Sequence, residues 1–122
     1  MKAAVFKAPG KPLSIENIDD PKCGENEMIL KVQQCGICGT DLHASDGGSM
    51  EPETGTIFGH EFSGEIVEIG KNLKTSFKIG EPAVSLPFIS CGTCQACMNG
   101  NPFFCSTNMQ STGMSPEVQG GY

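Results

Sequence analysis

The sequence predicts a mainly β domain, a partly open β-barrel of short strands joined by turns. Sixteen glycines and eight prolines are spread through the 122 residues, and they interrupt the chain too often for long helices. Several short segments alternate apolar and polar residues, which is typical of strands with one buried face. We find no long amphipathic helix and no internal repeat, and the length suits one domain with a modest core.

Strands are predicted at residues 1–6, 13–18, 27–34, 62–69 and 83–88. The third of these has the clearest pattern, because Met28, Leu30 and Val32 fall on one face of an extended chain. Turns rich in glycine and proline separate the segments, so each strand is expected to be short.

A short helix is expected at residues 41–44, capped by Thr40, because a threonine hydroxyl can accept a hydrogen bond from the first free N–H groups of a helix. Residues 45–55 are predicted as a loop. Residues 90–108 form a cysteine-rich lobe, and residues 109–122 are polar and glycine-rich, with no clear periodicity.

Charge and hydropathy exclude several classes of partner. The formal net charge of -6 argues against a nucleic-acid partner, because phosphate binding needs clustered lysine and arginine. No apolar run approaches the length of a membrane span. The apolar stretch within residues 1–7 is too short, and a charged residue follows too early, for this segment to act as a signal peptide. We therefore expect a cytoplasmic protein with no membrane partner.

Seven cysteines are many for this length, and an odd number fits a closed disulfide framework poorly. In a reducing cytosol, clustered cysteines indicate metal binding instead. Four of them follow the pattern C-x2-C-x2-C-x7-C, namely Cys91, Cys94, Cys97 and Cys105. Four thiolates complete a tetrahedral zinc site and leave no open position, so this site is predicted to be structural.

Two alternatives to zinc remain for this lobe. The four cysteines could be loosely disposed in a loop, without a metal. They could also bind an iron–sulfur cluster, since the bacterial ferredoxin pattern begins with the same C-x2-C-x2-C spacing. That pattern continues with three residues and then Cys-Pro, whereas here the gap is seven residues and Ser106 follows the last cysteine. The spacing therefore favours zinc.

A second metal site is predicted from two separate segments. Residues 35–43 combine thiols, a hydroxyl, a carboxylate and an imidazole, and residues 59–61 add another imidazole. We expect Cys38 and His60 to meet at a catalytic zinc, which usually has three protein ligands and one open position. Asp41 could accept the other N–H group of His60. The third ligand stays open between Glu61, Cys35 and a residue beyond Tyr122.

Each of these residues also has a plainer interpretation. A single histidine is more often an ordinary surface or core residue than a ligand, and a single threonine is more often a helix cap. Cys23 and Cys35 are better interpreted as small buried hydrophobic residues than as ligands.

Taken together, three motifs resemble the medium-chain zinc-dependent alcohol dehydrogenase family. They are GICGTDLH at residues 36–43, GHEFSG at residues 59–64 and the four-cysteine lobe, and they stand in the family's order. The resemblance implies the family's N-terminal catalytic domain, a GroES-like partly open β-barrel with short helices and a zinc-binding loop lobe. Gly39 stands where classical alcohol dehydrogenases often have arginine, which is more similar to the polyol, butanediol and threonine dehydrogenases.

The resemblance also implies roles for individual residues. Cys38 and His60 resemble ligands of the catalytic zinc, with Asp41 behind His60. Thr40 resembles the hydroxyl that takes the substrate proton, and His43 a later member of that relay. Glu61 resembles a carboxylate that transiently coordinates the catalytic zinc. The structural zinc ligands are matched by Cys91, Cys94, Cys97 and Cys105. The apolar segment around Leu86 and Phe88 is expected to approach the substrate pocket.

The implied activity is the oxidation of a small primary or secondary alcohol, or a polyol, by hydride transfer to NAD or NADP, with zinc as a Lewis acid. No G-x-G-x-x-G motif occurs in the chain. The family continues beyond Gly-Gly-Tyr into a nucleotide-binding domain, so we expect a truncated chain that is inactive alone and a homo-oligomer at full length. The alternative is a stand-alone zinc-binding module that mediates interactions without catalysis.

Overall fold

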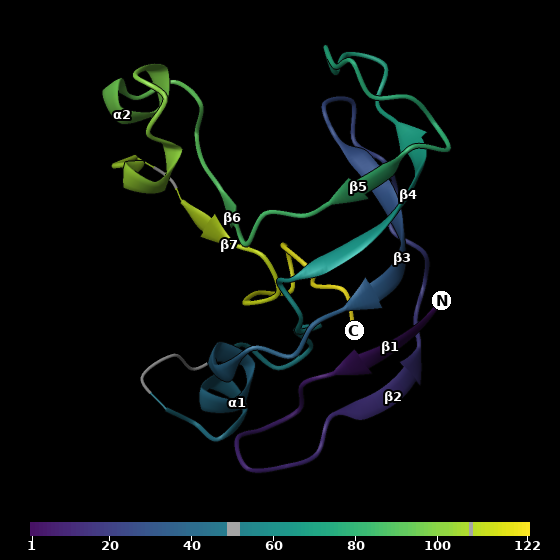
Figure 1. Cartoon of the computed structure of the whole chain (residues 1–122). Helices are drawn as coiled ribbons and strands as arrows, with labels where there is room; N and C mark the ends of the chain where they lie inside the picture. The colour runs from purple at the N-terminus through teal and green to yellow at the C-terminus, as the bar shows by residue number, and fades with distance from the viewer. Residues whose placement is uncertain (49–51, 108) are drawn as a thin grey trace.

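The computed structural model describes residues 1–48, 52–107 and 109–122 (Figure 1). Within these residues the chain forms seven short β-strands, two short α-helices and one 3-10 helix. The prediction of a mainly β domain is confirmed. Parts of the expected loop at 45–55 and of the expected lobe at 90–108 fall on residues 49–51 and 108, which lie outside the described residues.

Two antiparallel sheets form the body of the molecule. Strand β1 (Lys2–Val5) pairs with β2 (Ser14–Asn17). The larger sheet has the order β3-β4-β5 and consists of β3 (Met28–Cys35), β4 (Phe62–Ile69) and β5 (Pro82–Val84). Pairing of Cys35 with Phe62 brings the end of β3 beside the start of β4, which is where the predicted catalytic motifs lie.

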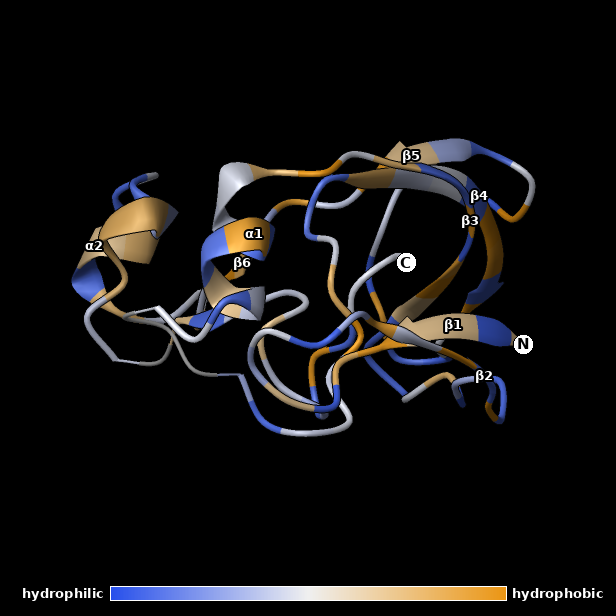
Figure 2. Cartoon of the chain, turned by 90° about the horizontal axis from the view of Figure 1, so that it is seen from below, coloured by the Kyte–Doolittle hydropathy of each residue, from blue (hydrophilic) through white to orange (hydrophobic). Residues whose placement is uncertain are grey.

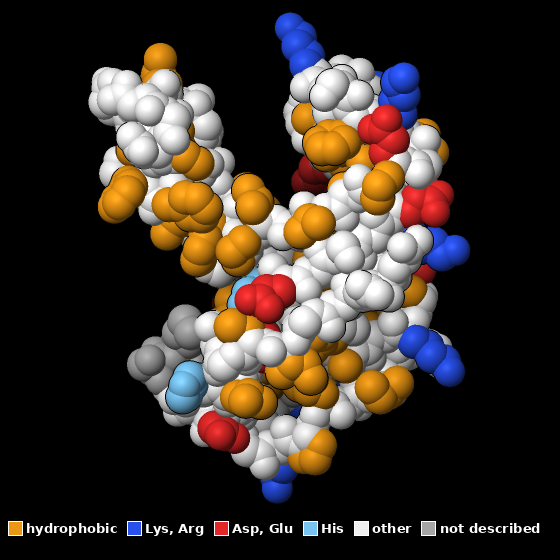
Figure 3. All heavy atoms as spheres, in the orientation of Figure 1, with side chains coloured by type: hydrophobic (Ala, Val, Ile, Leu, Met, Phe, Trp, Pro, Cys, Tyr) orange, Lys and Arg blue, Asp and Glu red, His pale blue; other side chains and the backbone are white. Residues whose placement is uncertain are grey.

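The cysteine-rich lobe projects from this body as an arm (Figure 1). A small antiparallel sheet of β6 (Phe88–Ile89) and β7 (Gln110–Ser111) leads into the arm. Beyond it lie helix α2 (Gln95–Met98) and the 3-10 helix η1 (Pro102–Phe104). The arm and the β3-β4-β5 sheet stand apart, and Figure 3 shows the molecule hollowed between them, with hydrophobic side chains on both walls.

Two local predictions are wrong. Helix α1 (Gly39–Ser45) has Cys38 as its N-cap rather than Thr40, because the Asp41 carboxylate accepts the Cys38 N–H from inside the first turn. The strand predicted at 83–88 is split between β5 and β6. Pro87 lies in the break and has no N–H to donate to a sheet, so the chain leaves the larger sheet and crosses to the arm.

The hydrophobic core lies between β1, α1 and the segment that precedes β4. One buried cluster contains Ala3, Val5 and Ile57, and a second contains Phe6, Ala44 and Phe58. The rings of Phe6 and Phe58 stack with their centroids 5.2 Å apart. Tyr122 packs against both clusters, so the end of the described chain belongs to the core.

Residues 119–122, for which the sequence indicates no regular element, form an ordered segment beside residues 57–59. The Gly120 N–H donates to the Ile57 carbonyl at 2.8 Å and the Tyr122 N–H to the Phe58 carbonyl at 3.1 Å. A side chain at Gly120 would collide with the Phe58 carbonyl. The glycines in this segment therefore serve close approach of two backbones, not flexibility.

The arm exposes apolar side chains. Helix α2 is largely apolar in Figure 2, and the exposed large hydrophobic residues of the arm include Met98 and Phe104. Phe88 and Phe103 meet edge to face, with ring centroids 6.2 Å apart. In the described part of the chain, no helix has the length and apolar character that crossing a membrane requires.

We predict that Ile66→Ala lowers the free energy of unfolding by about 2–5 kcal/mol, because a fully buried isoleucine loses its contacts and leaves a cavity. Ile66 is 0% exposed, whereas its neighbour Val67 on the opposite face of β4 is 39% exposed. Val67→Ala is the matched control and should cost less than about 1 kcal/mol. Urea unfolding followed by circular dichroism measures both, and equal losses would contradict this assignment of the two faces.

Candidate functional site

The start of α1 and the start of β4 carry the three ligand atoms of the candidate site. Cys38 comes just before α1, and His60 and Glu61 come just before β4. The Gly36 N–H donates to the Glu61 carbonyl at 2.8 Å and joins the two segments. As a result, ligand atoms of Cys38, His60 and Glu61 all lie within 4.8 Å of one another.

This donor set suits zinc. Thiolate sulfur, imidazole nitrogen and carboxylate oxygen are its usual protein ligands, and three of them leave a fourth position for water or substrate. Of the local candidates for the third ligand, the structure brings Glu61 into the group. The Cys35 thiol instead lies against Gly59 and Tyr122. There burial, with the nearby charge of Asp41, raises the pKa of the Cys35 thiol.

Asp41 is the centre of the hydrogen-bond network behind these ligands, although its side chain is only 4% exposed. Its Oδ2 accepts the Cys38 N–H at 2.9 Å and the Tyr122 hydroxyl at 3.0 Å. Its Oδ1 accepts the Gly59 N–H at 3.3 Å and lies 3.5 Å from Nδ1 of His60. These donors compensate the burial of the carboxylate. A histidine whose Nδ1 contacts a carboxylate has its Nε2 available for a metal.

Thr40 and His43 both lie on α1, one turn apart. The Thr40 Oγ1 atom is 3.6 Å from the Cys38 sulfur, so the hydroxyl lies at the donor group. His43 is exposed and shares its helix face with Thr40, because residues three apart on a helix are neighbours. The two side chains thus lead from the donor group toward solvent.

Gly59 and Tyr122 are parts of the site that the sequence analysis missed. Gly59 has φ +89°, and a side chain there would collide with the Cys35 sulfur and the Tyr122 ring. Tyr122 supplies a hydroxyl to the buried Asp41 carboxylate. The one sequence signal was the placement of two glycines, Gly59 directly before His60 and Gly121 directly before Tyr122.

The four-cysteine lobe brings its sulfurs together without a disulfide. All seven cysteines lie within the described residues and each is unbridged, and ligand atoms of four of them fall within 4.8 Å of one another: Cys91, Cys94, Cys97 and Cys105. The Cys94 and Cys97 sulfurs are 3.5 Å apart, and those of Cys91 and Cys97 are 3.9 Å apart. Sulfurs at about 2.3 Å from a tetrahedral zinc are about 3.8 Å apart, so the spacing fits.

Backbone N–H groups favour the thiolate form in this lobe. The Cys94 N–H donates to the Cys91 sulfur at 3.4 Å, and the Cys91 N–H donates to the Cys105 sulfur at 3.4 Å. Hydrogen bonds from Thr93 and Cys94 lower the pKa of the Cys91 thiol to about 5. Burial and the neighbouring Cys94 sulfur raise the pKa of Cys97 to about 11. The hydrogen bonds from Thr93 and Cys94 thus favour the thiolate form of Cys91, which is the form that binds a metal.

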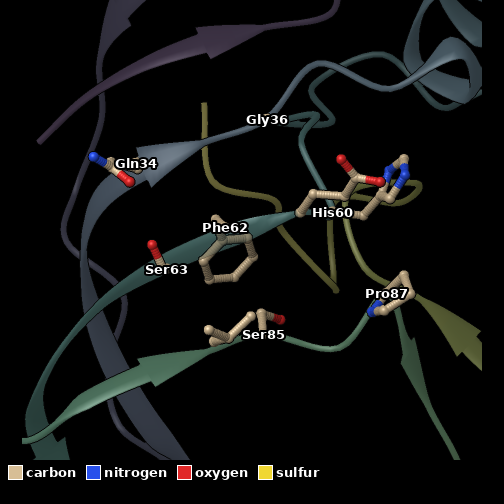
Figure 4. A pocket seen from close by; sticks show the side chains of 9 residues that line it. Gln34, Gly36, His60, Phe62, Ser63, Ser85 and Pro87 are labelled. Carbon is tan, nitrogen blue, oxygen red and sulfur yellow. The ribbon is translucent and has the colours of Figure 1, made fainter.

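An open pocket of about 420 Å³ adjoins the donor group (Figure 4). His60 and Glu61 line it, and the other lining residues come from β3, β4, the end of β5 and the segments that follow β3 and β5. The other lining residues are Gln34, Gly36, Phe62, Ser63, Val84, Ser85 and Pro87. The segment around Leu86 reaches this pocket through Val84, Ser85 and Pro87, while the exposed Leu86 and Phe88 side chains are outside its lining.

Comparison with known families decides the classification. The family described as "Alcohol dehydrogenase GroES-like domain" matches residues 24–122. The chain belongs to this family. The resemblance to alcohol dehydrogenases and the GroES-like fold predicted from the three motifs are therefore confirmed.

Two relatives of this GroES-like domain are dehydrogenases of greater length. An alcohol dehydrogenase of Geobacillus stearothermophilus is 39% identical over 125 aligned residues, which cover 100% of the chain and 35% of that protein. The L-threonine 3-dehydrogenase of Cutibacterium acnes is 38% identical, with the same coverage of 100% and 35%. The chain thus spans about a third of the length of these relatives.

Solved structures agree with the GroES-like assignment. The alcohol dehydrogenase of Aeropyrum pernix superposes with a TM-score of 0.85 at 32% identity, covering 99% of the chain and 35% of that structure. A Sinorhizobium meliloti protein bound to NADP, a zinc-binding dehydrogenase by name, gives a TM-score of 0.80 at 35% identity, covering 98% and 33%.

We predict that Asp41→Ala lowers the free energy of unfolding by about 2–3 kcal/mol in the presence of a metal chelator. The substitution leaves buried N–H and O–H donors without an acceptor, and that cost does not depend on metal. Asp46→Ala, at the exposed other end of α1, is the matched control and should change stability by less than about 0.5 kcal/mol. Denaturant unfolding measures both, and an unaffected Asp41→Ala variant would contradict the central place of this carboxylate.

Proposed function

We propose that the chain forms the zinc-binding catalytic domain of an NAD(P)-dependent alcohol or polyol dehydrogenase. The observation that carries the proposal is the group of sulfur, nitrogen and oxygen donors from Cys38, His60 and Glu61 within 4.8 Å of one another. This group adjoins an open pocket, of which His60 and Glu61 are lining residues. Membership of the alcohol dehydrogenase GroES-like domain family supports the same reaction class.

The residues around the donor group have complementary tasks. A zinc ion held there would act as a Lewis acid toward a substrate hydroxyl. Cys38 and His60 would hold the metal. Glu61 would be the third ligand, or would exchange with another group at that position. Thr40, with its hydroxyl 3.6 Å from the Cys38 sulfur, would accept the substrate proton, and the exposed His43 would pass it to solvent.

The pocket favours a small alcohol. Its walls combine apolar groups from Phe62, Val84 and Pro87 with the hydroxyls of Ser63 and Ser85. Apolar walls would exclude water from the reacting carbon, and the serine hydroxyls could hydrogen-bond a second hydroxyl of a polyol. This mixed lining is compatible with both a simple secondary alcohol and a short polyol.

The four-cysteine lobe would hold a second zinc with a structural role. Four sulfur ligands leave no position for a substrate, and the arm that carries them has little core of its own, since neither α2 nor η1 contains a buried residue. Metal binding would therefore supply the folding energy of the arm.

The proposal concerns a protein longer than this chain, which spans about a third of its relatives' length. We propose that the full-length protein uses a nicotinamide cofactor, acts on an alcohol or polyol and forms a homo-oligomer. A Sulfolobus acidocaldarius relative, 35% identical, is an NAD-dependent alcohol dehydrogenase by name. Nicotinamide chemistry would be the source of the redox step, while the residues of this chain would hold the substrate and its proton.

We predict two zinc ions per chain after extensive dialysis, measured by mass spectrometry of metals. Cys38→Ser should lower the content to one, because it removes a ligand of the Cys38–His60–Glu61 group, and Cys97→Ser should independently remove the other ion. Cys23→Ser is the matched control and should keep both, because Cys23 lies outside the two groups. One zinc in the unmodified chain, bound by the four cysteines alone, would favour the stand-alone zinc-binding module.

We further predict activity in a chimera in which this chain replaces the aligned third of the Geobacillus stearothermophilus alcohol dehydrogenase. The chimera should oxidise isopropanol with NAD, as followed by NADH absorbance. Thr40→Ala should lower kcat by about 100-fold or more, because the substrate proton loses its acceptor. Ser45→Ala, a hydroxyl deletion at the other end of α1, should leave kcat unchanged. A folded chimera with two zinc ions and no turnover would contradict the proposed reaction.

A further inference from the structure

We propose that Tyr122 is a positioning residue whose hydroxyl fixes the Asp41 carboxylate behind His60 and so sets the metal affinity of the Cys38–His60–Glu61 group. This inference rests on the proposed function, since it assumes that the group binds zinc. The Tyr122 hydroxyl lies 3.0 Å from Oδ2 of Asp41 and 3.0 Å from the Gly36 carbonyl oxygen. It is thus shared between the carboxylate and the segment that leads to Cys38.

The tyrosine is held firmly enough for this task. Its ring packs against both buried hydrophobic clusters. Its backbone N–H donates to the Phe58 carbonyl, and its carbonyl accepts the Ala4 N–H at 3.2 Å. Burial, together with the hydrogen bond to Asp41, raises the pKa of the Tyr122 phenol, so the hydroxyl keeps the proton that it donates. Ring and backbone contacts therefore place the hydroxyl independently of any metal.

The two carboxylate oxygens of Asp41 contact different partners. Oδ1 faces His60 Nδ1 and the Gly59 N–H, and Oδ2 receives the Cys38 N–H and the Tyr122 hydroxyl. Without the hydroxyl, Oδ2 would keep one partner, and the carboxylate could rotate away from the histidine. Because partners of this kind orient a ligating histidine and select its tautomer, their removal typically weakens metal binding by about 10–100-fold.

The hydroxyl also joins the segments that carry the three ligands. Gly36 accepts from Tyr122, and the Gly36 N–H donates to the Glu61 carbonyl at 2.8 Å. Asp41 connects the same hydroxyl to the backbone of Cys38 and to the side chain of His60. A single O–H group therefore contacts, directly or through one further residue, every segment of the donor group.

Tyr122→Phe tests the inference, because it keeps the ring in the core and deletes only the hydroxyl. Competition with a chromophoric chelator measures the two zinc affinities of the chain. We expect about tenfold weaker binding at the Cys38–His60–Glu61 group and unchanged binding at the four cysteines. Thr56→Val is the matched control: it deletes a fully buried hydroxyl that donates to the Glu53 carbonyl, outside the Asp41 network, and should change neither affinity.

A spectroscopic measurement separates positioning from a general loss of structure. The chain has two histidines, so long-range nitrogen–proton correlation spectra report each imidazole. In zinc-free Tyr122→Phe, the His60 ring nitrogens should shift, while those of the exposed His43 stay in place. In an Asp41→Asn background, Tyr122→Phe should have little further effect on zinc affinity, because the hydroxyl acts through that carboxylate.

The outcomes are distinguishable. Equal zinc affinity in Tyr122→Phe and the unmodified chain overturns the inference and leaves the proposed function standing. Equal weakening at both metal groups, or the same loss in Thr56→Val, assigns Tyr122 a general structural role and also overturns it. Absence of zinc at the Cys38–His60–Glu61 group in the unmodified chain overturns the proposed function itself. Selective weakening together with the His60 shift supports the inference.

Discussion

Burial of the Asp41 carboxylate is the constraint on which the rest of the site depends. A carboxylate that is 4% exposed needs donors on both oxygens, because an unpaired buried charge is costly. Its donors come from the turn before α1, from the backbone before His60 and from the last residue of the described chain. Satisfying one side chain therefore brings three distant segments together, and the ligand atoms of Cys38, His60 and Glu61 meet at the same place.

The two candidate metal groups are built by different physical means. The four-cysteine lobe closes within one short loop, where backbone N–H groups point at the sulfurs and the metal itself would supply most of the folding energy. The other group is assembled by strand pairing and core packing, with His60 buried and Glu61 exposed. A rigid, preorganised frame with one solvent-accessible donor residue suits exchange of a substrate, whereas a closed set of four thiolates suits a permanently bound structural metal.

Local sequence rules succeeded where local forces dominate and failed where other parts of the chain intervened. The strand at 62–69 was predicted with the bounds that the structure has, because the apolar residues Ile66, Val67 and Ile69 are followed at once by a turn at Gly70. Thr40 has a good capping side chain, yet the helix begins two residues earlier than predicted, because Asp41 accepts the Cys38 N–H from within the first turn. The predicted strand at 83–88 is divided because Pro87 stops sheet pairing and the chain turns to the arm.

By itself, the sequence determined the class of the domain, the family and the four-cysteine lobe, whose spacing confines the sulfurs to one loop. It also named Cys38, His60 and Glu61 as candidates, but left the third ligand open among several residues. Only the tertiary structure brought Glu61 close to Cys38 and His60 and placed the Tyr122 hydroxyl on Asp41, 81 residues away in the chain. Such contacts depend on strand register and on packing of the whole core, which no local pattern of residues encodes.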